Sequence, residues 1–132
     1  MPLRLRVGVN ADLERIMDIQ FEAFGPDPWN QTLFPNGISP DSRARLTEYA
    51  KKDMHENPHV TFMTVVDTEL DNQIIAFGKW YIYKQERPES EWNNSDSRVW
   101  GEDTNREAIH AFFTPLGEKR RKYMAGKPHC RK

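Results

Sequence analysis

The chain has 132 residues, of which 37% are hydrophobic and 30% charged, so it can form one modest globular core. Its formal net charge of −1 predicts no general attraction to nucleic acids or to anionic membranes. No apolar run approaches the roughly 18 residues that a membrane-spanning helix needs, and the first residues lack the apolar stretch of a secretory signal. The single cysteine, Cys130, excludes an internal disulfide. These features predict a cytoplasmic or nuclear protein without membrane contact.

The N-terminal residues predict a strand followed by a helix. Apolar side chains alternate with other residues in the period of a half-buried strand at Leu3, Leu5 and Val7. Asn10 can then cap a helix over residues 11–24. The inward face of this helix is expected to comprise Leu13, Ile16, Met17, Gln20 and Phe24.

A second helix is expected after a short helical turn over residues 29–34. Ser39 can cap it and Pro40 suits the first helical position, so these two residues are a strong start signal. The helix itself is expected over residues 43–56.

The middle of the chain predicts an antiparallel hairpin. Residues 60–67 and 74–84 are rich in β-branched and aromatic side chains, and residues 68–73 between them are polar and suit a turn. Residues 85–104 are polar and acidic, which favours a surface loop. Its two tryptophans, Trp92 and Trp100, leave open a role in binding a partner.

The C-terminal part predicts two helical pieces and a basic tail. A helix is expected over residues 105–113, after which Pro115 should interrupt it. A second helical piece is expected to run to residue 125 and to end at Gly126. Residues 117–132 contain seven Lys or Arg and one acid. A solvated tail over residues 127–132 is expected, with phosphate or RNA contact as the alternative.

The order of elements is therefore strand, helix, helix, strand, strand and then an inserted helix pair. A mixed α/β fold of the α+β kind, with a mostly antiparallel sheet, is the natural way to bury these faces. We expect one incomplete domain over residues 1–132. Its parts are a sheet-and-helix core (1–84), a polar loop (85–104), a helical segment (105–126) and a basic tail (127–132).

The histidine, cysteine and acidic residues define no catalytic or metal site by themselves. His55 and His59 are four residues apart, but an Asn-Pro pair between them should end the helix, so they should not share a face. His129 and Cys130 are adjacent, and adjacent side chains rarely point at one target. Four acids could act as a general base, although each is a solvated acid by default: Glu22, Asp27, Glu48 and Glu86. The catalytic residue stays unknown.

Several short segments, taken in order, carry a resemblance to a known family. They are Pro2-Leu3-Arg4-Leu5-Arg6, Ala11-Asp12, Ala23-Phe24, Leu33-Phe34-Pro35, Val65-Val66-Asp67 and Ile74-Ile75-Ala76-Phe77-Gly78-Lys79-Trp80. The last is similar to a third-strand pattern, I-x-G-x-A-x-W. The run Tyr123-Met124-Ala125-Gly126-Lys127-Pro128-His129 is similar to the segment before the fourth strand in fungal-type members. Together they resemble the N-terminal half of a GNAT-type N-acetyltransferase.

The resemblance implies a partial GNAT-like fold and acetyl transfer from acetyl-CoA to an amine of a small molecule or a protein. In the family, a glycine loop of pattern Q/R-x-x-G-x-G/A follows the fourth strand and binds the cofactor pyrophosphate through backbone N–H groups. No two of the seven glycines here are closer than nine residues. The cofactor half, with the family's usual tyrosine acid, is therefore expected to be absent. No residue of this chain is expected to bind acetyl-CoA, and the chain is expected to be inactive alone.

The resemblance also implies where the acceptor would bind. In the family, the loop between the first two helices lines the acceptor side, which here corresponds to residues 24–34. The candidate acceptor residues are Phe24, Asp27, Trp29, Phe34 and Trp80. Ordinary packing is the alternative for the aromatic residues, and Trp80 could fill the buried face of the sheet together with Ile74, Ala76 and Gly78.

The third strand of the family pairs with the fourth. Because the fourth strand is expected to belong to the missing half, the strand that begins at Ile74 and ends at Lys84 would have an open edge. We expect the chain to dimerise or aggregate through this edge, to pair there with a missing half, or to cover it with the helices of residues 105–125. Two functions stay open: an acetyltransferase completed by a second polypeptide, and a non-catalytic module that binds through the edge.

Overall fold

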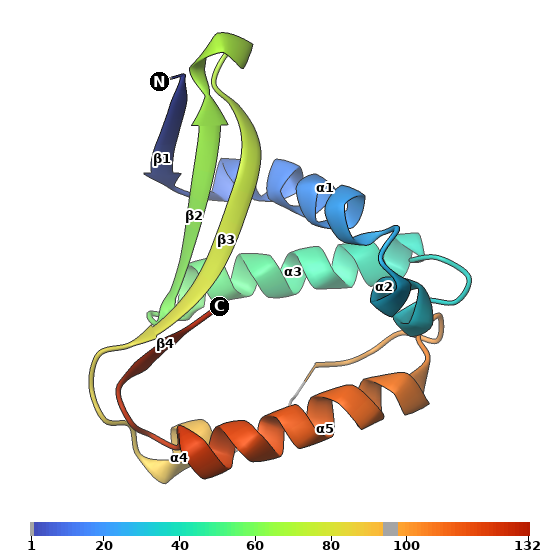
Figure 1. Ribbon diagram of the computed structural model, residues 1–132, viewed down its shortest axis with the longest axis vertical. Coiled ribbons are helices and arrows are strands. Elements are labelled where there is room, and N and C mark those ends of the chain that lie inside the picture. Colours follow the sequence, from blue (N-terminus) through green and yellow to red (C-terminus); the bar gives the residue numbers. More distant parts are fainter. Residues whose placement is uncertain (1, 94–97) are drawn as a thin grey trace.

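The computed structural model describes residues 2–93 and 98–132 and confirms the expected mixed fold with an antiparallel sheet (Figure 1). The four strands, hydrogen-bonded in chain order, are β1 (Leu3–Val7), β2 (Val60–Asp67), β3 (Gln73–Tyr83) and β4 (His129–Arg131). The helices are α1 (Leu13–Phe24), α2 (Pro28–Leu33), α3 (Pro40–Glu56), α4 (Glu89–Trp92) and α5 (Arg106–Tyr123). Two 3-10 turns, η1 (Asn10–Asp12) and η2 (Thr68–Leu70), precede α1 and β3. No helix in the described ranges is long and apolar enough to cross a membrane.

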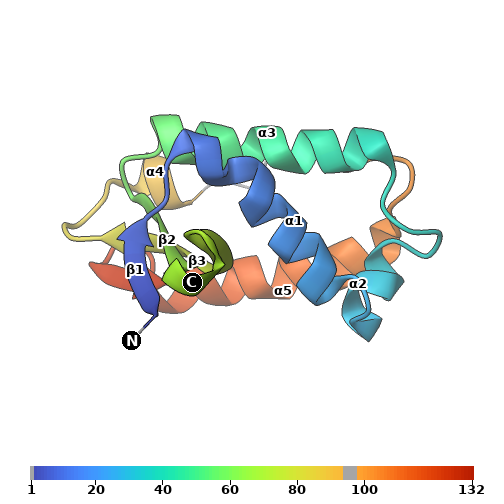
Figure 2. The same ribbon diagram turned by 90° about the horizontal axis from the view of Figure 1, so that it is seen from above.

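Helices α1 and α3 cover one face of the sheet, which we call the inner face, and α5 runs below the sheet (Figures 1 and 2). The main core lies between this face and the two helices, and its buried members are Leu13, Ile16, Met17, Ala50 and Phe62. A second buried cluster, Leu33, Phe34 and Ile109, joins α2 to α5. The molecule therefore has a sheet-and-helix body and a C-terminal helix that is attached mainly through α2.

A side-chain cap explains where α3 begins, whereas α1 begins without one. At α3, the Ser39 hydroxyl accepts the N–H of Ser42 and a proline occupies the first turn, as expected. At α1 the expected cap is wrong. Asp12 occupies the N-cap position of α1 but makes no side-chain hydrogen bond to that helix. Its carboxylate instead accepts the N–H of Val9, at 2.8 Å, and closes the 3-10 turn η1.

The reason for this difference is the position of Arg6, which turns its guanidinium to the inner side of β1. The two terminal nitrogens of Arg6 donate to the two carboxylate oxygens of Asp12, at 2.6 and 2.9 Å. These hydrogen bonds lower the pKa of Asp12 below its usual value, although burial opposes the change. A bidentate ion pair thus fixes β1 against the start of α1.

A β-bulge in β3 changes which residues face the core. Ile74 is buried on the inner face, but the register then shifts, so that Ala76 rather than Ile75 pairs with the next residue of β2. The expectation that Trp80 shares a buried face with Ile74 is therefore wrong. Trp80 lies on the outer face and is 37% exposed, whereas Lys79 faces inward and binds Asp53 of α3.

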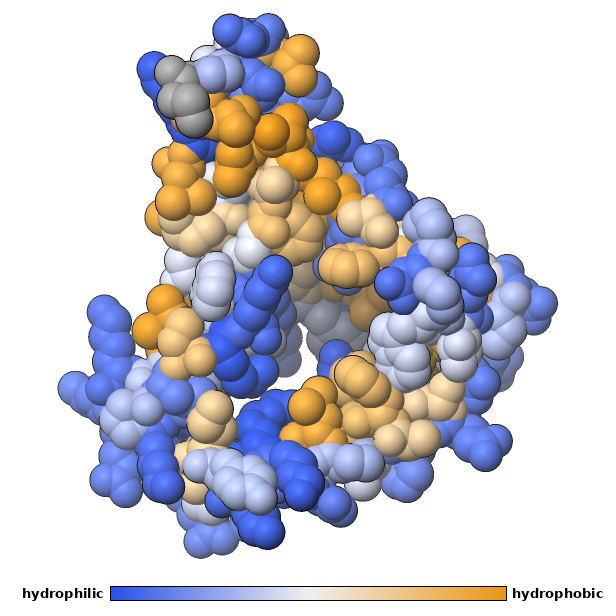
Figure 3. Space-filling view, in the orientation of Figure 1, coloured by the Kyte–Doolittle hydropathy of each residue, from blue (hydrophilic) through white to orange (hydrophobic). Residues whose placement is uncertain are grey.

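The outer face of the sheet is apolar and largely uncovered. The alternating residues Leu3, Leu5 and Val7 of β1 point to this side and are exposed by 43%, 68% and 58%. Figure 3 shows hydrophobic residues gathered over the upper part of the sheet. The period of β1 is as predicted, but its apolar side is not the buried one.

The expected helix pair at residues 105–126 is wrong, because α5 is one continuous helix with Pro115 inside it. A proline removes one backbone hydrogen bond, and both ends of α5 are well stabilised. Asn105 accepts the N–H of Ala108 at the start, and the last turn carries three basic residues that suit the helix dipole. After α5, Ala125 takes the left-handed conformation, with φ of 46°.

The C-terminal residues form a strand instead of a solvated tail. Residues 129–131 make up β4, which pairs antiparallel with residues 81–83 of β3. Gly126 permits this return of the chain, because a side chain there would begin 2.3 Å from the carbonyl oxygen of Arg87.

The expected loop at residues 85–104 contains α4 and an ordered approach to α5. Trp100 packs against Phe113, with ring centres 5.5 Å apart. Its residues 94–97 lie outside the described part of the chain.

Asp103 ties this segment to the beginning of α3. Its carboxylate accepts the N–H of Ser39 at 2.8 Å and the hydroxyl of Ser42 at 2.5 Å. Burial alone would raise the pKa of Asp103, but the hydrogen bonds from Ser42 and Ser39 outweigh it and lower the pKa.

We predict that Asp103→Asn lowers the free energy of unfolding by about 1–3 kcal/mol at neutral pH, because hydrogen bonds to a charged acceptor are lost. Because the folded-state pKa is lowered, the carboxylate contributes stability above its unfolded pKa, near about 4, and loses it as the pH falls through the folded value. Urea unfolding from pH 7 to pH 3 should therefore show the two proteins converging in acid. A constant difference across this range would contradict the prediction.

Candidate functional site

A hollow between α1, α2 and the start of α3 lies where the acceptor side was expected. Its lining residues are Phe21, Gly25, Asn30, Gln31, Phe34, Pro35, Gly37, Ile38 and Arg43. Phe34 forms an apolar floor and is 5% exposed. At the rim, the guanidinium of Arg43 lies 4.7 Å from the centre of the Phe21 ring and pairs with Asp18. The lining offers an apolar surface, amide groups and one neutralised cation, but no carboxylate that could act as a base.

The structure brings only one of the five predicted acceptor residues into this hollow. Phe34 lines it, while Phe24 at the end of α1 is 57% exposed and outside the lining. Trp29 packs on Phe112 of α5, with ring centres 4.4 Å apart. Trp80 is on the outer face of the sheet, away from the loop between the helices.

Asp27, the fifth candidate, has a clear structural role. Its carboxylate accepts the N–H of Trp29 at 2.8 Å, and Pro28 follows it, so Asp27 caps α2. Of the other acids considered as a base, Glu22 lies 3.7 Å from Arg15, and Glu86 is exposed in the segment after β3. None of these acids lines the hollow.

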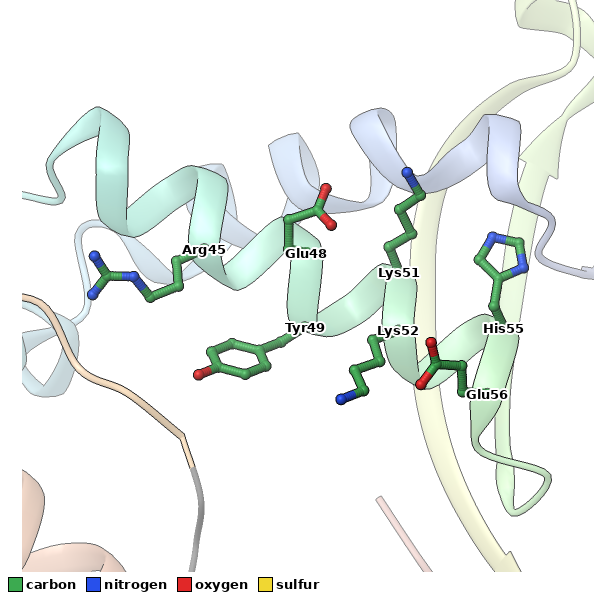
Figure 4. A pocket seen from close by; sticks show the side chains of 7 residues that line it. All are labelled: Arg45, Glu48, Tyr49, Lys51, Lys52, His55 and Glu56. Atoms are coloured by element: carbon green, nitrogen blue, oxygen red, sulfur yellow. The ribbon is translucent and has the colours of Figure 1, made fainter.

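A second hollow runs along α3 and contains the remaining acid, Glu48. Its lining residues are Arg45, Glu48, Tyr49, Lys51, Lys52, His55 and Glu56. All of them come from one helix, and their side chains point in different directions rather than toward a common point (Figure 4). The Tyr49 hydroxyl accepts the N–H of Val99 at 2.7 Å, so this residue anchors the following segment. The arrangement is a polar helix surface and builds no catalytic group.

His55 and His59 do not share a face, as the sequence predicted. His55 contacts Asn10 at 2.9 Å, whereas His59 lies against Tyr83, with ring centres 4.9 Å apart. His129 and Cys130 are successive residues of β4 and therefore point to opposite faces. Among residues 2–93 and 98–132, no group of three or more potential ligands could hold a metal ion.

Sequence reasoning missed a group of aromatic and basic residues at the end of β3. Arg87 lies over Tyr83, with its Cζ 3.6 Å from the ring centre, and Arg131 of β4 lies 3.9 Å from the centre of Tyr81. The alternation of Tyr81 and Tyr83 in the strand was a usable signal. The partner side chains could not be assigned, because β4 was not expected.

Comparisons with known proteins do not assign the chain to a family. No protein-family profile matches the sequence, and no curated protein matches it significantly. Among solved structures, the chain is similar to one described as histone acetyltransferase HPA2 and related acetyltransferase from Corynebacterium glutamicum. The two are 17% identical with a TM-score of 0.44, over 80% of this chain and 56% of that chain. The chain thus spans just over half the length of this neighbour.

We predict that Asp27→Ala lowers the free energy of unfolding by about 1 kcal/mol, because α2 loses its cap. Glu86→Ala, which removes an exposed acid from a segment outside the helices, should change stability by less than about 0.5 kcal/mol. Urea unfolding followed by circular dichroism gives both values. Equal stability of Asp27→Ala and the unmodified chain would exclude the capping role.

Proposed function

We propose that this chain forms the acceptor-side part of a GNAT-type N-acetyltransferase domain. The segments that carry the sequence resemblance fall on consecutive elements of the fold. Residues 2–6 overlap β1, residues 11–12 precede α1, residues 65–67 end β2 and residues 74–80 lie in β3. The order of elements therefore supports the proposal over nearly the whole chain.

The single observation that carries this proposal is the pairing of β3 with β4. The resemblance implies that the third strand pairs antiparallel with a fourth strand, which follows the segment at residues 123–129. β4 begins at His129 and pairs antiparallel with β3. The glycine loop that would follow the fourth strand in the family has no counterpart among the glycines of this sequence.

The proposed chemistry is direct transfer without a covalent enzyme intermediate. The nitrogen of a neutral amine attacks the thioester carbonyl of acetyl-CoA, the C–S bond breaks, and the leaving thiolate takes up a proton. The acceptor amine would bind in the apolar hollow that has Phe34 as its floor. The cofactor-binding loop would have to come from outside residues 1–132, so we expect these residues to be inactive alone.

We expect no binding when the purified, folded chain is titrated calorimetrically with acetyl-CoA up to millimolar concentration, because it has no backbone cradle for the pyrophosphate. Circular dichroism on the same sample is the control for folding. Saturable one-to-one binding would overturn the division into acceptor and cofactor parts. It would also mean that the cofactor is held by another kind of site.

A second candidate function is a non-catalytic module that binds through the edge of β3. The observation that favours it is that β4 pairs only with residues 81–83, so residues 73–80 have no neighbouring strand on that side within the described ranges. An open edge presents N–H and C=O groups to an added strand. The exposed apolar outer face lies beside it and would add buried area. A second copy of this chain is the proposed occupant, because it supplies a strand of the same chemistry.

For this candidate we predict concentration-dependent dimerisation, measured by light scattering. Ile75→Lys should shift the protein toward monomer, because a charge on an edge strand opposes strand addition. Leu70→Lys is the matched control: Leu70 is also exposed, at 54%, but it lies in η2 outside the edge. A protein that stays monomeric at all concentrations would exclude self-association through this edge.

A further inference from the structure

Two arginine side chains near the end of β3 have no acidic partner among the described residues. Arg87 follows β3, and its Cζ lies 3.6 Å from the centre of the Tyr83 ring. Arg131 of β4 lies 3.9 Å from the centre of the Tyr81 ring and 6.0 Å from the centre of Tyr83. Both guanidinium groups therefore adjoin the same tyrosine. Within the described part of the chain, neither arginine forms an ion pair.

Strand pairing places these groups together. In the β3–β4 register, Arg131 is opposite Tyr81 and His129 is opposite Tyr83, so their side chains share the inner face. The rings of His129 and Tyr83 have centres 4.9 Å apart. Arg87 joins the group from the following segment, where its Nη2 donates to the carbonyl oxygen of Ala125 at 3.2 Å.

Several nitrogens of this group lack hydrogen bonds. His129 Nδ1 lies 2.7 Å from the carbonyl oxygen of Lys127, which can only accept, so Nδ1 is the donor and Nε2 is left over. Three nitrogens are shielded from solvent and have no partner among the described residues: Arg87 Nε, His129 Nε2 and Arg131 Nε. Polar groups without a protein partner remain available for hydrogen bonds with a bound molecule.

Among residues 2–93 and 98–132, no carboxylate forms an ion pair with these two guanidinium groups. The carboxylate that reaches the group from α3, Asp53, is already bound to Lys79 and lies 3.3 Å from the Tyr81 hydroxyl. Cation–π contacts hold each guanidinium in place but leave its charge intact. Two adjacent cations on aromatic supports, with free donor capacity, form a receptor for an anion.

We propose that this cluster, which consists of Tyr81, Tyr83, Arg87, His129 and Arg131, binds an oxyanion: a phosphate or a carboxylate group of a ligand. Guanidinium groups present paired N–H donors that match the oxygens of both groups. The tyrosine rings hold the guanidinium planes before binding, which reduces the conformational entropy lost on binding. A protonated His129 would add one more donor. The proposal goes beyond the proposed function and does not depend on acetyl transfer.

The test is a titration of the isotope-labelled full chain with inorganic phosphate, and in parallel with acetate, at ionic strength held constant with sodium chloride. We expect saturable NMR shifts confined to residues 81–87 and 129–131. Tighter binding of phosphate would identify a phosphate-bearing ligand, and tighter binding of acetate a carboxylate. Shifts that do not saturate, or that centre on the basic end of α5, would overturn the proposal.

Variants test the role of each guanidinium. Arg131→Gln and Arg87→Gln are each expected to weaken the binding of the preferred anion by about tenfold or more. Lys51→Gln is the control, because it removes one exposed positive charge from α3, outside the cluster, and should change the affinity by less than about twofold. If Arg131→Gln disturbs β4, Arg131→Lys keeps the charge, loses the planar fork and should still bind several times more weakly than the unmodified chain. Unchanged affinity in the folded arginine variants would contradict the proposal.

Discussion

The bulge at Ile75 determines the direction of every later side chain of β3, and much of the molecule depends on it. Side chains alternate between the two faces of a strand, so one extra residue exchanges the faces for the rest of its length. Beyond the bulge, Lys79 reaches Asp53 on α3, and Tyr81 and Tyr83 face inward. Without it, these side chains would lie on the open outer face, and Trp80 would be directed into the core.

Local signals predicted the elements that depend on neighbouring residues. Ser39 and Pro40 located the start of α3, and the two apolar runs separated by a polar turn located the β2–β3 hairpin. The predictions are wrong where contacts between residues far apart in the sequence determine the structure. β4 has three residues and exists because β3 offers it a partner, and Pro115 is tolerated because both ends of α5 are anchored. The prediction of which side of β1 is buried was wrong for the same kind of reason, since Asp12 binds the side chain of Arg6 on the inner side.

In the candidate site, too, some features follow from the local sequence and others depend on distant contacts. Phe34 lines the hollow between the first helices, beside the loop that the resemblance assigns to the acceptor side, and its role in binding an acceptor stays a prediction. The residue type alone could not show whether an aspartate acts as a general base or as a helix cap. Asp27 takes the role of a helix cap. Likewise, the arginine cluster depends on the pairing of β3 with the distant β4, so the alternation of Tyr81 and Tyr83 could not identify the basic residues that join them.

The short pairing between β3 and β4 has a consequence for the native ensemble. β4 joins the sheet through three residues, after the chain has passed through α4 and α5. A peripheral pairing of this length opens with a much smaller free energy than the long β2–β3 ladder, so docked and released forms of the C-terminal strand can interconvert while the core stays folded. Any molecule that contacts only the docked form would shift this equilibrium toward it. Binding of a molecule beside the C-terminal strand would then change how often that strand is paired at the edge of the sheet.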